Sequence, residues 1–185
     1  MNKNIELEYK VLVSKEQFYD LYNHYNKPTF FTQVNVYYDT FHLDIRKIRG
    51  AMRIRDVDGD HIFTLKLPSV IGVMEFEKSL PENKLEALQD EEILTLLQKN
   101  HIQGPFRELT TLKTQRAIVN TGYAELCFDI SSYGDTTDYE IEYEYIKDHD
   151  GLKAFQEIMD TIHVTYTGNC ISKIQRALLA ANIKD

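Results

Sequence analysis

The chain has 185 residues, of which 43% are hydrophobic and 27% are charged. This composition provides enough apolar material for a packed core and excludes an intrinsically disordered chain. Lysine and arginine total 21 while aspartate and glutamate total 29, so the net charge is −8. That balance argues against a nucleic-acid-binding protein built on overall basic charge. No stretch reaches the ~18 consecutive apolar residues of a membrane-spanning helix, so we expect no membrane partner.

The beginning of the chain and its cysteines favour a cytoplasmic protein. Charged residues occur at Lys3 and Glu6, before an apolar stretch could form, so we expect no secretory signal. Cys127 and Cys170 are too few for a disulfide scaffold, and neither the cysteines nor the six histidines have the spacing of a zinc site. No internal repeat or linker divides the sequence, and we expect a single domain over residues 1–185.

Alternating apolar and polar residues predict strands over most of the chain. Residues 4–13 alternate first, and Ser14 and Gln17 then have the spacing of a capping box that begins a helix. Strands are expected at 31–39, 49–57, 61–68, 73–80, 107–119, 122–130 and 138–146, with helices at 83–100, 150–163 and 170–182. Asp58-Gly59-Asp60 predicts a hairpin turn. This order of elements is typical of an α+β protein with an antiparallel sheet or barrel.

Charged residues of one sign gather on the polar faces of five expected strands. They are Glu6 and Glu8 (with Lys10), Arg53 and Arg55, Glu75 and Glu77, Glu125 and Asp129, and Glu140, Glu142 and Glu144. A solvent-exposed face accounts for any one of these strands. Five together need a further explanation, because like charges repel unless an opposite charge lies between them. Carboxylates bind Mg²⁺ or Mn²⁺ and basic side chains bind phosphate oxygens, so the pattern predicts a polyphosphate site with a divalent metal.

The motif Glu6-x-Glu8-x-Lys10 on the first strand resembles the opening of the CYTH domain, the family of triphosphate tunnel metalloenzymes named for class-four adenylate cyclases and thiamine triphosphatases. The resemblance continues in order through Tyr38-Asp39-Thr40, Met52-Arg53-Ile54-Arg55, Thr64-Leu65-Lys66, Glu75-Phe76-Glu77-Lys78, Thr114-Gln115-Arg116, Leu126-Cys127-Phe128-Asp129, Tyr139-Glu140-Ile141-Glu142 and Ser172-Lys173. It covers nearly the whole chain. The small stand-alone CYTH proteins of Gram-positive bacteria, often labelled adenylate cyclases, are the most similar subset.

The resemblance implies an eight-stranded antiparallel β-barrel with flanking helices, whose hydrophilic tunnel binds a triphosphate with one or two divalent cations. By position, the metal ligands would be Glu6, Glu8, Glu140 and Glu142, with Glu75, Glu77 and Asp129 as further acids. The phosphate-binding residues would be Lys10, Arg53, Arg55, Lys66, Arg116 and Lys173. Glu6, Glu8, Lys10 and Asp129 would be the catalytic residues among them.

One position departs from the family pattern. Members often carry Lys-x-Arg on the sixth strand, whereas the residue two positions before Arg116 is Thr114. Lys113 is out of phase and is expected to point outward unless a bulge intervenes. The tunnel would then lack one phosphate-binding cation.

Three functions remain open from the sequence. The first is metal-dependent hydrolysis of a triphosphate, in which water attacks the terminal phosphorus while basic side chains stabilise the developing charge. The second is cyclisation of ATP to cyclic AMP and pyrophosphate, which needs a pocket for the base. The third is a protein that binds polyphosphate or nucleotides without catalysis. The sequence does not determine the oligomeric state.

Overall fold

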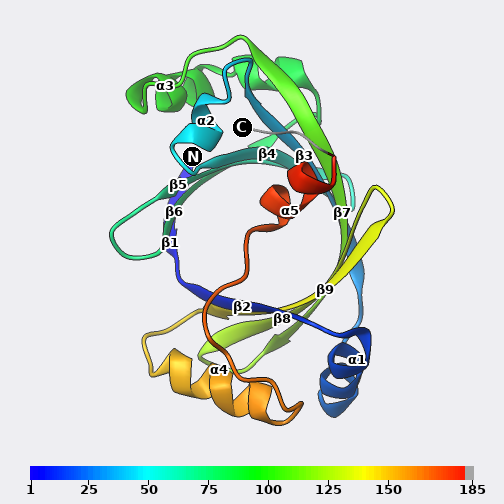
Figure 1. The fold of residues 1–185 in the computed structure, drawn as a ribbon. Helices are drawn as coiled ribbons and strands as arrows, with labels where there is room; N and C mark the ends of the chain where they lie inside the picture. Colours follow the sequence, from blue (N-terminus) through cyan, green and yellow to red (C-terminus); the bar gives the residue numbers. More distant parts are fainter. Residues whose placement is uncertain (182–185) are drawn as a thin grey trace.

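The computed structural model describes residues 1–181. Its elements are β1 (Asn2–Glu6), β2 (Glu8–Val13), α1 (Lys15–His24), β3 (Phe31–Thr40), α2 (Asp44–Lys47), β4 (Ala51–Val57), β5 (Asp60–Pro68), β6 (Val73–Leu80), the 3-10 helix η1 (Leu85–Gln89), α3 (Glu91–Lys99), β7 (Phe106–Asn120), β8 (Ala124–Tyr133), β9 (Thr136–Tyr145), α4 (Gly151–Asp160) and α5 (Lys173–Ala180). All strand pairs are antiparallel, and the sheet curls into a ring with α1, α3 and α4 outside it and α5 over its opening (Figure 1). The α+β fold class and the antiparallel barrel are confirmed.

The strand count differs from the expected eight, because the first expected strand is interrupted. The sheet order is β1-β6-β5-β4-β3-β7-β8-β9-β2, so the two ends of the sheet are β1 and β2, which only Leu7 separates in the chain. Residues of β1 pair with β6, and residues of β2 pair with β9. The chain therefore changes partner at Leu7, and nine strands result among residues 1–181. Gly72 permits the close approach here, since a Cβ on it would lie 2.3 Å from the carbonyl oxygen of Glu6.

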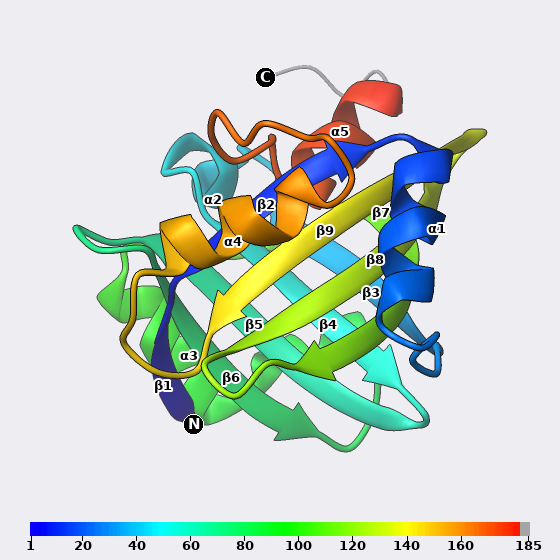
Figure 2. The same cartoon turned by 90° about the horizontal axis from the view of Figure 1, so that it is seen from below.

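Apolar side chains cover the outside of the ring, and the polar side chains face its inside. On one side, Phe63 and Leu65 of β5 pack with Ile93 and Leu97 of α3. On the other side, α1 and α4 cover β8 and β9 with a second apolar cluster, which includes Phe155 (Figure 2). Because side chains alternate along a strand, burying these residues outside the ring directs the charged neighbours inward.

Local capping determines where the helices begin. The expected helix at 83–100 is divided into η1 and α3, because the Asp90 side chain accepts hydrogen bonds from the backbone N–H of Glu92 and Ile93. The helix expected at 170–182 begins at Lys173, after the N-cap Ser172, and residue 182 lies outside the described residues. Ser14 forms the predicted capping box. No helix in residues 1–181 is long and apolar enough to cross a membrane.

The short helix α2 was not predicted. It is held by the buried carboxylate of Asp39, which accepts hydrogen bonds from the backbone N–H of Ile45 and Arg46, both at 3.0 Å. The predicted hairpin is confirmed, since Val57 pairs with Asp60 and the turn residues Asp58 and Gly59 have φ angles of 52° and 88°.

Candidate active site

The inner face of the ring surrounds a cavity of about 180 Å³. The predicted residues that line it are Glu6, Glu8, Lys10, Arg53, Arg55, Lys66, Arg116, Glu142 and Lys173. Helix α5 lies over one end of the ring, and it brings Lys173 into the cavity (Figures 1 and 2). The structure therefore brings together, around one space, residues that lie as far apart in sequence as Glu6 and Lys173.

Arg53 and Arg55 of β4 and Lys66 of β5 form a group that we call the basic wall. Arg55 donates through Nε to the Asn35 side chain at 3.0 Å, and no carboxylate in residues 1–181 forms an ion pair with it. Burial and the charges of Arg53 and Arg116 lower the pKa of Arg55 to about 10. The buried Nε of Arg53 has no hydrogen-bond partner in the described part of the chain. These guanidinium groups are therefore available to an anion.

Acidic residues border the basic wall on the neighbouring strands. Lys66 Nζ lies 2.5 Å from Glu6 and 3.4 Å from Glu75, and Arg53 lies 3.7 Å from Glu75. Burial alone would raise the pKa of Glu6, but Lys66 lowers it overall. Glu77 lies farther along β6, where it accepts a hydrogen bond from Thr64 at 3.3 Å, and it is not among the residues that line the cavity.

Asp129 of β8 and Glu140 and Glu142 of β9 form a second group, which we call the acidic wall. All three are buried, and one oxygen of each lies within 4.8 Å of the others. The Lys173 ammonium lies among them, 2.8 Å from Asp129 and 2.6 Å from Glu142, and it also contacts Glu140. Arg116 binds both oxygens of Asp129, at 2.7 and 2.5 Å, and contacts Glu142. Burial would lower the pKa of Lys173, but these carboxylates raise it well above its usual value.

The acidic wall has the donor chemistry of a divalent metal site. Three carboxylates that converge within 4.8 Å supply the hard oxygen ligands that Mg²⁺ and Mn²⁺ prefer. Burial and the charge of Glu142 raise the pKa of Glu8 above its usual value although Lys10 contacts it, so Glu8 carries its negative charge less readily than a free carboxylate and would gain from a nearby cation. The residues therefore fit a metal, and in the described structure the Lys173 ammonium supplies the compensating positive charge.

Thr114, which stands where family members often carry a lysine, occupies the inward-facing position predicted for it. Thr114 lies inside the ring, where its hydroxyl and that of Ser131 are 3.0 Å apart, and Lys113 is exposed on the outside. The bulge of β7 occurs opposite Tyr37 and Tyr38, several residues before Lys113, so it does not turn this lysine inward.

Several polar residues in the cavity or beside the acidic wall were not predicted from the sequence. Arg176 of α5 lies 2.7 Å from both Asp138 and Glu140. The spacing of Lys173 and Arg176, three residues apart on one helix, places both on the same face and could have indicated this contact. Gln33 and Asn35 of β3 also line the cavity. They alternate with apolar residues, but uncharged amides are common on the polar face of a strand, so the sequence did not indicate that they line a binding site.

A family model described as the CYTH domain matches residues 4–177. The Bacillus subtilis protein named "Putative triphosphatase YjbK" is 29% identical over 170 residues, which are 89% of this chain and 90% of that protein. A Bacillus halodurans crystal structure named as a "putative adenylate cyclase" is 32% identical, with a TM-score of 0.85 over 95% of this chain and 98% of that one. A Hippeastrum protein, HpAC1, is 21% identical with a TM-score of 0.76 over 95% of each chain, and shows the same fold. The chain belongs to the CYTH domain family.

Proposed function

We propose that this chain is a cytoplasmic, metal-dependent enzyme that hydrolyses a triphosphate inside the ring. The observation that carries this proposal is the charge of the basic wall, where the half-buried Arg55 has no carboxylate partner in residues 1–181. A cation that is partly removed from water without a counter-ion is costly, and a phosphate chain would supply the missing charge. The name of the Bacillus subtilis relative supports the same activity.

The basic and acidic residues have different roles in the proposed reaction. Phosphate groups would bind to Lys10, Arg53, Arg55, Lys66, Arg116 and Lys173, and metal to Asp129, Glu140 and Glu142 with Glu6, Glu8, Glu75 and Glu77 as further acids. A bound Mg²⁺ or Mn²⁺ would neutralise charge on phosphate oxygens. The arginines stabilise the charge that develops as water attacks the terminal phosphorus, so no side chain needs to form a covalent bond.

A second cavity could hold the organic part of a triphosphate substrate. For this reason ATP cyclisation, which needs a pocket for the base, is the second candidate function. It has a volume of about 700 Å³, adjoins the first cavity at Tyr37 and Arg49, and has apolar side chains such as Tyr38, Met52 and Leu109 in its lining. A nucleoside attached to the triphosphate could occupy this space. The name of the Bacillus halodurans protein refers to a cyclase, whereas the Hippeastrum protein is named as an adenylyl cyclase that reveals a dominant triphosphatase activity.

A substrate panel separates these functions. The protein would be incubated with inorganic triphosphate and with ATP, each with Mg²⁺, Mn²⁺ or a chelator, and phosphate and cyclic AMP would be measured. We expect metal-dependent phosphate release. Cyclic AMP with no phosphate release would contradict the proposal and support the cyclase. Tight triphosphate binding without turnover under either metal would instead support a non-catalytic binding protein.

A further inference from the structure

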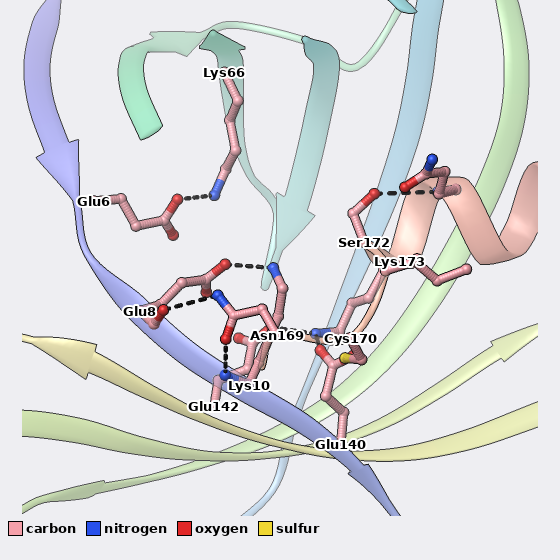
Figure 3. Close-up of polar contacts among 12 residues, drawn as sticks. Glu6, Glu8, Lys10, Lys66, Glu140, Glu142, Asn169, Cys170, Ser172 and Lys173 are labelled. Atoms are coloured by element: carbon pink, nitrogen blue, oxygen red, sulfur yellow. Dashed lines mark hydrogen bonds and ion pairs between the residues drawn. The ribbon is translucent and has the colours of Figure 1, made fainter. Parts of the chain in front are cut away.

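The edge of β2 that faces away from β9 is occupied by a side chain instead of a strand. Lys10 donates its backbone N–H to Oδ1 of Asn169 at 2.7 Å, and Nδ2 of Asn169 donates to the carbonyl oxygen of Glu8 at 3.0 Å (Figure 3). The backbone N–H of Cys170 then donates to the carbonyl oxygen of Lys10 at 3.2 Å. The amide of Asn169 therefore satisfies the two backbone groups that a neighbouring peptide would satisfy in a sheet.

These backbone groups belong to residues whose side chains line the cavity. Glu8 and Lys10 both face inward and contact each other there. Because the peptide groups of Glu8 and Lys10 point to the same edge of β2, the two hydrogen bonds of Asn169 fix the position of both residues at once.

Asn169 also lies in the segment that leads into helix α5. Its Oδ1 accepts a second hydrogen bond from the Tyr166 hydroxyl at 2.8 Å. Only three residues separate it from Lys173, whose ammonium lies in the acidic wall, and Ser172 between them caps the helix. A shift at Asn169 would therefore move the start of α5 and, with it, Lys173.

We propose that Asn169 is a positioning residue, whose amide holds β2 and the start of α5 in one arrangement and so fixes Glu8 and Lys10 relative to Lys173. This inference rests on the proposed function only for its effect on rate. A misplacement of ~1 Å in a catalytic site can reduce the rate about 10²-fold, whereas exposed hydrogen bonds such as the three of the Asn169 side chain each contribute little to stability. The signature of this role is a large change in rate with a small change in melting temperature.

The variants are Asn169→Ala and Asn169→Asp, with Asn120→Ala as the matched control. Asn120 is also exposed, and its Oδ1 also accepts a backbone N–H at 2.7 Å, from Gly122 in the turn between β7 and β8. We expect Asn169→Ala to lower kcat for triphosphate about 10- to 100-fold, while Asn120→Ala stays within about twofold. Asn169→Asp keeps the acceptor for Lys10 but places an oxygen against the Glu8 carbonyl, so its loss should be at least as large. A lower melting temperature with unchanged kcat would overturn the proposal.

A second measurement needs no substrate. Cys127 is fully buried and Cys170 is partly exposed, so a thiol reagent reports on Cys170 in the folded protein. We expect Asn169→Ala to raise the reaction rate of Cys170 severalfold over the Asn120→Ala control. An unchanged thiol rate would overturn the anchoring of α5 even if the enzyme is active. A raised thiol rate in a protein that releases no phosphate would support the anchoring and contradict the proposed function instead.

Discussion

The carboxylates of the acidic wall are neutralised by cations of the same chain, whereas Arg55 of the basic wall has only the Asn35 amide as its partner in residues 1–181. The two groups lie across the ring from each other, β8 and β9 on one side and β4 on the other (Figure 1). The acidic wall therefore already holds its counter-charge, whereas in the basic wall Arg53 and Lys66 contact carboxylates and Arg55 does not. An anion would therefore find the Arg55 guanidinium without a carboxylate partner, whereas Asp129, Glu140 and Glu142 could hold a metal only if the Lys173 ammonium gave up its contacts with them.

The largest effect that this comparison predicts is on the acidic wall. Arg116→Ala should lower the free energy of unfolding by about 3–5 kcal/mol, because it leaves Asp129 and Glu142 buried with one partner fewer. Urea unfolding without added metal measures it. A loss below ~1 kcal/mol would mean that Arg116 does not neutralise the acidic wall.

The next largest effect is expected at Lys173, whose ammonium occupies the place that a metal would take in the acidic wall. Lys173→Ala should destabilise the metal-free protein, because Asp129, Glu140 and Glu142 then repel one another. Mn²⁺ at a hundredfold excess over its dissociation constant should restore about 2.7 kcal/mol, if it binds only the folded state. Thermal unfolding with Mn²⁺ and with a chelator measures both effects. The same melting temperature in both conditions would exclude a metal at the acidic wall.

A third prediction distinguishes the two walls by their response to metal. Glu8→Gln and Arg53→Ala should each lower kcat/KM about tenfold or more, since each removes a charged contact of ~1.5–3 kcal/mol. Raising Mn²⁺ should restore part of the rate of Glu8→Gln, because that variant loses negative charge beside the acidic wall. Steady-state assays over a Mn²⁺ series would test this. Equal rescue of Arg53→Ala would contradict the assignment of separate roles.

The smallest effect is expected on the outside of the ring. Lys113 and Arg116 lie on the same strand, but Lys113 is exposed and points away from the cavity. Lys113→Ala should change the free energy of unfolding by less than ~0.5 kcal/mol and leave kcat/KM unchanged. It is the control for Arg116→Ala, and a clear loss of activity would show that the outer face of β7 takes part in the reaction.

The alternation of residues predicted much of the fold and of the site. Which residues share a face of a strand depends on a local period of two, so Arg53 and Arg55 could be placed together from the sequence alone. The same rule put Lys113 outside and Thr114 inside, as the structure has them. The resemblance to the CYTH family then supplied the closure into a barrel, which no local pattern contains.

Contacts that depend on tertiary structure could not be predicted. Nothing in the alternation of residues 4–13 indicates that pairing changes from β6 to β9 at Leu7, because the break arises from closing the ring. Asn169 lies in a segment without periodicity, and its role depends on the free edge of β2. The resemblance placed Lys173 in the tunnel as a phosphate-binding residue, but its ion pairs with the acidic wall depend on the position of α5, which no local pattern contains.

The central claim is that the basic wall binds the phosphate chain independently of metal. Titration calorimetry of inorganic triphosphate in the presence of a chelator tests it most directly, with the unchanged protein and with Arg55→Ala. We expect binding to the unchanged protein and at least tenfold weaker binding to Arg55→Ala. We also expect an equal or higher melting temperature of the free variant, because a half-buried cation without a counter-ion has been removed. Equal affinity in the two proteins, or binding only when metal is present, would contradict the account.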